Sequence, residues 1–224
     1  MYLSRATLYP VSDIKSFIQV QCQDPYREHQ MVWRLFADDP DAERDFLFRY
    51  EQKLGVVKYY ILSKRVPRDP DGLWDIETKK FAPQLRNSQK LAFVLRVNPV
   101  ITVRGKNGHS KRHDVVMHEK YLMKYKMLPA EERPSQYELI TRGGRRWLEA
   151  RASTSGFSFQ PDQVAVVAYQ QHRAGRRKKG IQFSTIDFEG VLSVTDADRF
   201  RQVLFSGIGK ARAFGCGLFL VRRI

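Results

Sequence analysis

Apolar and polar positions alternate over several short stretches in the first half of the chain, a pattern typical of strands with one buried face. YLSRATLY at residues 2–9 has this alternation, and RDFLFRYE at 44–51 and VVKYYILSK at 56–64 are rich in aromatic and β-branched residues. We expect a strand in each, with the last two paired. The next stretch, VPRDPDGLWD at 66–75, predicts a loop by its Pro, Asp and Gly content.

Between the first two strands, residues 12–37 predict helical structure interrupted by Pro25. Asp24 is the expected N-cap, with Pro25 at the first helical position. In the helix predicted over 25–37, the apolar residues at core spacing are Met31, Val32, Leu35 and Phe36. A strand, a helix and then strands are the beginning of a βαββαβ unit.

The second half repeats this order after a polar stretch at 81–89 that contains Pro83. The expected elements are a strand at 90–103 that ends or bulges at Asn98–Pro99, a basic loop at 104–114, helices at 119–128 and 142–154, a hairpin of strands 162–173 and 181–194, a helix at 195–208 capped by Thr195 with Asp198 in the capping-box position, and a strand at 218–223. The expected fold is therefore α+β, with two tandem ferredoxin-like (RRM-like) βαββαβ modules at residues 1–86 and 90–224.

The net charge of the chain indicates which kind of partner it binds. The 224 residues include 39 Lys plus Arg against 24 Asp plus Glu, a net charge of +15. A hydrophobic content of 42% is enough for a packed core and argues against wholesale disorder. Such a basic folded protein attracts polyanions, of which nucleic acid is the commonest. The sequence shows no apolar run with the length of a signal peptide or a membrane span, so we expect a cytoplasmic protein with no membrane partner.

The metal-ligating residue types are sparse. Cys22 and Cys216 are far apart and lack CxxC spacing, which disfavours a disulfide scaffold or a zinc site and indicates core or helix positions. His109, His113 and His118 stand among cations, which disfavour a bound metal ion. No DxD or ExK cluster stands out for two-metal catalysis. We expect neither metal nor cofactor.

Glycines and cations gather at the end of the chain in GIGKARAFGCGLFLVRRI, residues 207–224. Such clusters bring backbone close to phosphate. The segment lacks the Ser or Thr of Walker A and the third glycine of the Rossmann motif, and it follows a helix instead of a strand. The segment matches the sequence signature of RRM domains only in part. A turn that joins the last helix to the last strand is the simpler alternative.

Tyr26 and His29 are three residues apart on the helix predicted over 25–37, so they share a face. Histidine exchanges protons near neutral pH, and RNA cleavage without metal needs such a group beside a ribose 2′-hydroxyl. On spacing alone, a single helical histidine is more often structural.

Several stretches together resemble one family. GIGKARAFGCGLFLV resembles the C-terminal glycine-rich loop of the CRISPR repeat endoribonucleases of the CasE (Cse3) family. MYLSRATLYP resembles the opening strand of that family, and DPYREHQMVWRLF resembles its helix with the Tyr-x-x-His pair. RDFLFRYE, LRVNPVITV and FEGVLSVTD follow in register, so the resemblance covers the whole chain.

The resemblance implies that His29 is the principal catalytic group and that Tyr26 assists or orients it. The implied products carry a 2′,3′-cyclic phosphate and a 5′-hydroxyl. Arg34 is a candidate to hold the scissile phosphate, because relatives have a lysine nearby. Arg27 and Gln30 are weaker candidates for backbone contacts.

The resemblance also implies an RNA-binding surface. A basic hairpin in the second module holds the stem of the repeat, and the glycine-rich loop lies by the RNA. The RNA-binding candidates are Lys111, Arg112, Arg173, Arg176, Arg177, Lys178, Lys179, Gly207, Gly209, Lys210, Arg212, Gly215 and Gly217. Arg142, Arg145 and Arg146 could extend the surface. Solvation is the alternative for any one of these cations.

The sequence thus leads to one main hypothesis. The chain would be a metal-independent endoribonuclease that cuts precursor crRNA at the 3′ base of the repeat stem-loop and then holds the mature crRNA within Cascade beside its other subunits. The alternatives are a non-catalytic RNA-binding subunit and a DNA-binding or metal-dependent nuclease.

Overall fold

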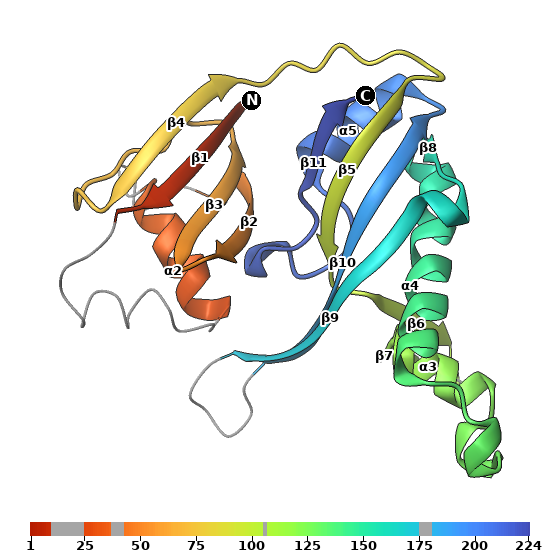
Figure 1. Cartoon of the computed structure of the whole chain (residues 1–224). Coiled ribbons are helices and arrows are strands. Elements are labelled where there is room, and N and C mark those ends of the chain that lie inside the picture. The colour runs from red at the N-terminus through yellow and green to blue at the C-terminus, as the bar shows by residue number, and fades with distance from the viewer. Residues whose placement is uncertain (10–24, 37–42, 105–106, 175–180) are drawn as a thin grey trace.

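The protein was studied as a computed structural model that describes residues 1–9, 25–36, 43–104, 107–174 and 181–224. These residues form two sheet-containing modules that lie side by side and are joined by the segment 81–89 (Figure 1). The first module consists of β1 (Tyr2–Leu8), α2 (Pro25–Arg34), β2 (Phe46–Lys53), β3 (Val56–Ser63) and β4 (Trp74–Lys80).

The first sheet is antiparallel with the order β2-β3-β1-β4, which is the order of a βαββαβ module. The place of the second helix is taken by an extended connection at 64–73, where Pro67 and Pro70 disfavour helix. The Asp69 carboxylate accepts hydrogen bonds from the backbone N–H groups of Asp71 (3.1 Å) and Trp74 (2.7 Å). This turn ends the connection and starts β4 inside the stretch predicted to be a loop.

Helix α2 packs its apolar side on this sheet. Val32, Leu35 and Phe36 are buried with Phe48 and other sheet residues, and Met31 is partly buried, as the periodicity predicted. The helix itself ends at Arg34, earlier than predicted. The preceding helical stretch at 12–24, with Asp24 and Cys22, lies outside the described residues.

The second module contains β5 (Lys90–Val97), β6 (Val100–Arg104), β7 (Ser110–Asp114), α3 (Val115–Leu122), α4 (Gln136–Ala152), β8 (Phe157–Ser158), β9 (Val164–Ala174), β10 (Ile181–Val194), α5 (Ala197–Ser206) and β11 (Phe219–Arg223). The sheet order is β11-β5-β10-β8, with β9 also paired to β10. Strands β11, β5, β10 and β9 reproduce the ferredoxin-like order, so the predicted architecture of tandem modules is confirmed for the strands.

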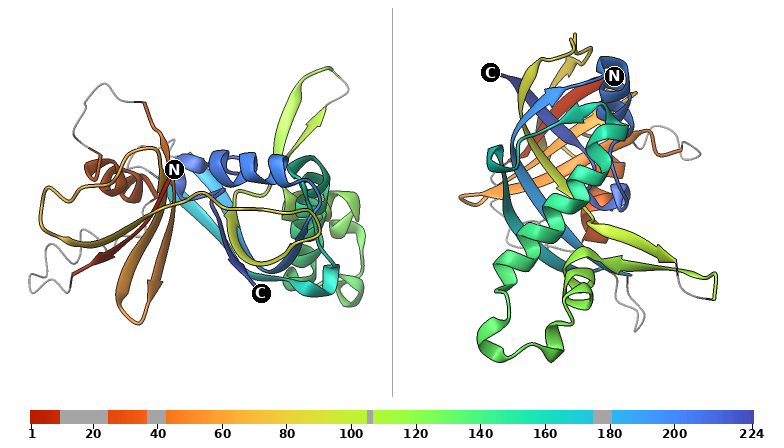
Figure 2. Two further views of the ribbon diagram at one scale, coloured as in Figure 1. Left: turned by 90° about the horizontal axis from the view of Figure 1, so that it is seen from above. Right: turned by 90° about the vertical axis from the view of Figure 1, so that its right-hand side faces the viewer.

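The predicted break at Asn98–Pro99 is confirmed, since β5 ends at Val97 and the chain leaves the sheet. The Asn98 side-chain amide donates to the Ser184 carbonyl oxygen at 2.7 Å, which fixes the exit. The stretch predicted to be a basic loop is instead a second hairpin, β6–β7, which projects away from the module (Figure 2). Lys111 and Arg112 are exposed on β7.

Three helix boundaries also differ from prediction, each because of a specific cap. Helix α3 starts at Val115 because the Asp114 carboxylate accepts from the first-turn N–H groups. Helix α4 starts at Gln136 because Ser135 and Glu138 form a capping box. Helix α5 is capped by Asp196, not Thr195, and ends at Ser206 with Gly207 as its C-cap, two residues before the predicted end.

The modules meet through an apolar cluster of Leu47, Leu62 and Leu218 and through buried charges. Arg96 donates to both Asp187 carboxylate oxygens at 2.8 Å and to the Tyr50 carbonyl oxygen at 3.2 Å, which joins β5 to β2. Arg49 Nη1 lies 3.6 Å from the same carboxylate. The register of β9 and β10 shifts between Asp187 and Phe188, so a bulge lies next to the residue whose carboxylate contacts both arginines.

Candidate active site

Helix α2 places His29 at the junction of the two modules. Pro25 stands at the first helical position, Glu28 lies in the first turn and Arg34 in the last, in the sense that complements the helix dipole. Val32 is buried against the first sheet. His29 and Trp33 are four residues apart, so they lie one turn from each other on the same side of the helix. The side chain of His29 is half-buried.

Three aromatic rings enclose the imidazole of His29. The ring centroids of Trp33, Phe46 and Phe214 lie 6.2, 6.3 and 6.4 Å from it. Trp33 Nε1 donates a hydrogen bond of 3.0 Å to His29 Nε2. Because an indole N–H can only donate, Nε2 must be the acceptor, and the neutral imidazole carries its proton on Nδ1. Nδ1 is buried and has no hydrogen-bond partner among the described residues.

The surroundings favour the neutral imidazole. Burial lowers the pKa of His29, and the positive charge of Arg44 lowers it further. The ring is therefore mostly unprotonated at neutral pH and can accept a proton.

Two arginines bring positive charge near this ring: Arg44 acts on His29, and Arg212 acts on Arg44. Burial lowers the pKa of Arg44, which lies two residues before the start of β2, and the charge of Arg212 lowers it further. Arg212 Nε donates to the Gly209 carbonyl oxygen at 3.2 Å. Among the ion pairs of the described residues, none involves Arg44 or Arg212. This uncompensated positive charge beside a neutral imidazole suits an anion such as a phosphodiester.

The glycine-rich segment carries Arg212 and Phe214 to the site. Four of its glycines adopt positive φ angles: Gly207 (74°), Gly209 (80°), Gly215 (75°) and Gly217 (89°). A Cβ at Gly217 would lie 2.6 Å from the Ile208 carbonyl oxygen, and one at Gly207 would lie 2.9 Å from a Leu47 methyl carbon of the first module. Glycine is thus required by chain conformation and close packing.

Within this segment, Gly207, Gly215 and Gly217 are buried, Gly209 and Arg212 are half-buried, and Lys210 is exposed. The segment forms a short 3-10 turn at Arg212–Phe214, between the two modules. Contact of these six residues with RNA remains a prediction.

The other candidates on α2 face different surroundings. Tyr26 is 48% exposed one turn before His29. Gln30 is exposed and Arg27 half-buried. Arg34 forms an ion pair of 2.7 Å with Asp71 of the 64–73 connection. Five residues of helix rotate Arg34 by about 140° from His29, so the structure brings Arg44, not Arg34, to the imidazole.

The hairpin β9–β10 borders α2 (Figure 1). Arg173 is exposed on β9, while the tip residues Arg176, Arg177, Lys178 and Lys179 lie outside the described residues. His172 on β9 is half-buried. Its ring stacks on Phe183 at 4.9 Å and its Nε2 lies 2.8 Å from Thr185 Oγ1.

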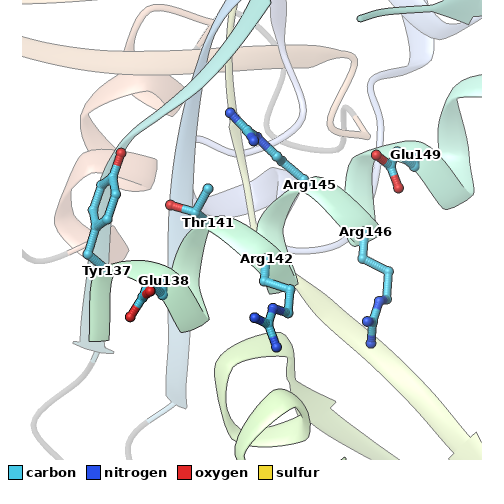
Figure 3. Close-up of a pocket in the computed structure, with 7 residues that line it drawn as sticks. All are labelled: Tyr137, Glu138, Thr141, Arg142, Arg145, Arg146 and Glu149. Carbon is cyan, nitrogen blue, oxygen red and sulfur yellow. The ribbon is translucent and has the colours of Figure 1, made fainter. Parts of the chain in front are cut away.

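The arginines of α4 do not form a single track. They line a pocket of about 430 Å³ in which Arg142 and Arg146 point to one side of the helix and Arg145 to the other (Figure 3). Arg146 pairs with Glu119 at 2.6 Å, and Arg145 donates to the Val164 carbonyl oxygen at 3.2 Å. Both side chains are thus engaged within the protein.

Within the described residues, no group of three or more His, Cys, Asp or Glu side chains could hold a metal ion. The rings of His113 and His118 lie 6.4 Å apart. Over the same residues, no helix has the length and apolarity needed to cross a membrane.

Sequence reasoning missed three residues of the site: Trp33, Arg44 and Phe214. Trp33 could have been found, because it lies one helical turn after His29. Arg44 and Phe214 reach the imidazole from distant parts of the chain, and no local pattern marks them.

Comparisons with known proteins identify the family of this chain. A family model described as "CRISPR associated protein" matches residues 1–223. CRISPR system Cascade subunit CasE of Escherichia coli K12 is 31% identical over 199 residues, which covers 88% of this chain and 90% of that protein. CRISPR-associated endoribonuclease Cse3 of Thermus thermophilus is 26% identical over 234 residues and 99% of both chains. A solved structure of Thermus thermophilus Cse3 bound to an RNA representing a pre-cleavage complex has the same fold, with a TM-score of 0.69, 24% identity and coverage of 99% of this chain and 98% of that one. The chain therefore belongs to the CasE/Cse3 family of CRISPR-associated proteins.

Proposed function

We propose that this protein is an endoribonuclease that binds the stem-loop of a CRISPR repeat, cleaves precursor crRNA at the 3′ base of the stem without a metal ion, and keeps the mature crRNA within Cascade. Its relatives are named as an endoribonuclease and as a Cascade subunit. The observation that carries the proposal is a half-buried His29 whose pKa is lowered by burial and by Arg44, with Arg212 near enough to Arg44 to lower the pKa of that arginine.

The reaction follows from these groups. The ribose 2′-hydroxyl attacks the adjacent phosphorus, and His29 Nε2 accepts its proton. The bond from phosphorus to the 5′-oxygen breaks, which leaves a 2′,3′-cyclic phosphate, and the departing oxygen takes a proton from solvent to become a 5′-hydroxyl. Arg44 and Arg212 stabilise the charge that develops on the phosphoryl oxygens. Such acid–base assistance is worth about 10²- to 10⁴-fold in rate.

Substrate must displace one contact of the free protein. Trp33 occupies the Nε2 lone pair, so the substrate hydroxyl replaces the indole N–H as its partner. Tyr26, exposed one turn away, then assists or orients the imidazole. Arg34, Arg27 and Gln30 are proposed to contact the RNA backbone next to this helix.

The rest of the surface would hold the stem. A basic hairpin suits A-form RNA, which proteins read by shape, phosphates and 2′-hydroxyls. Exposed Arg173 on β9 and Lys111 and Arg112 on β7 are consistent with this role, and Lys210 would extend it to the glycine-rich segment. Arg176→Ala with Arg177→Ala should weaken binding. The slope of the logarithm of the binding constant against the logarithm of the salt concentration should become shallower by about 0.7–0.9 per lost phosphate contact. Unchanged affinity would remove these residues from the stem-binding surface.

The direct test is cleavage of a labelled repeat hairpin in EDTA. The wild-type protein should cut at one bond, and His29→Ala should bind the RNA but not cut it. His109→Ala, which alters an exposed histidine of the β6–β7 hairpin, is the matched control and should cut normally. A 2′-deoxy substitution at the nucleotide before the cut should block the reaction. Binding without cleavage by the wild type would indicate a non-catalytic RNA-binding subunit, and cleavage only with added metal would contradict the mechanism.

A further inference from the structure

A second cavity lies between the modules, next to the candidate active site. It has a volume of about 310 Å³ and is lined by residues of α2, β2, β5, β9, β10 and the 3-10 turn. These elements surround the centre of the molecule (Figure 1). The proposed cleavage mechanism makes no use of it.

Phe214 connects this cavity to His29. Its side chain lines the cavity, and its ring centroid lies 6.4 Å from that of the imidazole. On α2, Glu28 lines the cavity and directly precedes His29. A nucleotide whose phosphate lies at His29 would therefore lie close to the ring of Phe214, and so to the cavity that this ring lines.

The cavity wall is unsuited to phosphate. Two carboxylates, Glu28 and Glu51, line it, and Glu51 also accepts a hydrogen bond of 2.8 Å from Arg49 Nε. The cation in its lining, Arg96, already binds both oxygens of Asp187. A phosphate would meet negative charge here, whereas the positive charges of Arg44 and Arg212 lie outside the cavity lining and attract it there. The RNA backbone is thus expected at the arginines, which leaves the cavity for a base.

The wall matches a nucleobase in both shape and polarity. Phe214 and His172 provide aromatic rings, and proteins hold unstacked RNA bases on such rings while contacting their edges. Gln52 and Gln170 add side-chain amides. Gln52 Oε1 accepts from the Tyr50 hydroxyl at 2.8 Å, so its NH₂ group is oriented as a donor. The carboxylates accept hydrogen bonds, which favours bases whose amino group offers two N–H donors over uracil, which offers only N3–H.

We infer that this cavity binds one unpaired base next to the scissile phosphate and prefers adenine, cytosine or guanine over uracil. The inference rests on the proposed function for the identity of the polyanion. It assigns base recognition to a site separate from the stem-binding hairpin.

The test measures RNA affinity in a His29→Ala background, where cleavage does not interfere. Repeat hairpins carry an abasic site, or each of the four bases, at the two nucleotides that flank the scissile bond. At one of these positions the abasic RNA should bind about tenfold more weakly, since stacking of a base on an aromatic side chain has an effect of this size. Uracil should bind several-fold more weakly than the amino bases.

Two neighbouring glutamines provide a matched pair of variants. Gln170 lines this cavity, whereas Gln171 lines a different pocket on the other side of β9. Gln170→Leu should reduce the penalty of the abasic site, and Gln171→Leu should leave it unchanged. Glu51→Gln should reduce the discrimination against uracil, because an amide can donate as well as accept.

The outcomes separate the two proposals. Base-independent binding at both nucleotides, or an equal penalty in Gln170→Leu and Gln171→Leu, would overturn the base site even if the wild type cleaves the RNA. Base-dependent binding that Gln170→Leu weakens, combined with absent cleavage by the wild type, would support the base site and refute the nuclease.

Discussion

The buried charges between the modules offer the sharpest test of how the active site is held together. Asp187 receives two hydrogen bonds of 2.8 Å from Arg96 and lies 3.6 Å from Arg49. The exposed fractions of the Asp187, Arg96 and Arg49 side chains are 11%, 18% and 5%. Solvent therefore screens the pairs little, in contrast to surface ion pairs.

Asp187→Ala leaves both guanidinium groups buried without this carboxylate. Removal of one partner from a buried ion pair costs about 3–5 kcal/mol, because the remaining charge is left uncompensated. For a protein of this size, each kcal/mol lowers Tm by about 2–4 °C, so Tm should fall by about 6–20 °C. Thermal unfolding followed by circular dichroism, with urea unfolding as a second measurement, gives both quantities.

Asp198→Ala is the matched control. Asp198 also pairs with an arginine, Arg201, at 2.6 Å, but its side chain is 83% exposed. Its loss should cost less than about 1 kcal/mol. Equal destabilisation by Asp187→Ala and Asp198→Ala would refute the reasoning.

A double variant separates the charge effect from the packing effect. Asp187→Leu with Arg96→Met removes the main pair together, and Arg49 keeps its 2.8 Å contact with Glu51. This variant should regain most of the stability lost in Asp187→Ala. Its rate of RNA cleavage should nevertheless be lower than that of the wild type, because the contacts that join β5 and β10 to β2 are gone.

Three further predictions follow from the site. Arg44→Met should raise the pKa of His29, because a positive charge that disfavours the imidazolium form is removed. An NMR titration measures this pKa, and the acid limb of the pH profile of cleavage should move to higher pH with it. An unchanged or lower pKa would contradict the assignment. Gly217→Ala should destabilise the protein more than Gly55→Ala in urea unfolding, because both have positive φ but only at Gly217 would the Cβ meet a carbonyl oxygen at 2.6 Å; equal losses would refute the clash. In a Cys22→Ser background, Cys216 should react with a thiol reagent at pH 8 only after unfolding, because burial raises its pKa to about 12; rapid reaction of the native protein would show an accessible thiolate.

Local sequence was sufficient wherever an element has one buried face. The apolar spacing in α2 predicted its buried side, and strands β1, β2, β3, β5, β9, β10 and β11 followed from alternation and β-branched content, whereas β4 and β8 were not predicted. It failed for β7, whose sequence SKRHD has no buried face because the hairpin projects into solvent. It also missed the cap of α5 by one residue, since Thr195 and Asp196 are both good caps and only the backbone decides between them.

The sequence by itself determined the two modules, the basic character of the chain and the helix that carries Tyr26 and His29, because these depend on composition and on short-range periodicity. Tertiary structure alone decided what surrounds the imidazole. Arg44 comes from the edge of β2, and Arg212 and Phe214 come from a turn at the end of the second module. Their meeting depends on how two sheets pack through Leu47, Leu218 and the Asp187 cluster. Such long-range contacts leave no local pattern in the chain, because the local preference of each residue for a helix, strand or turn does not depend on them.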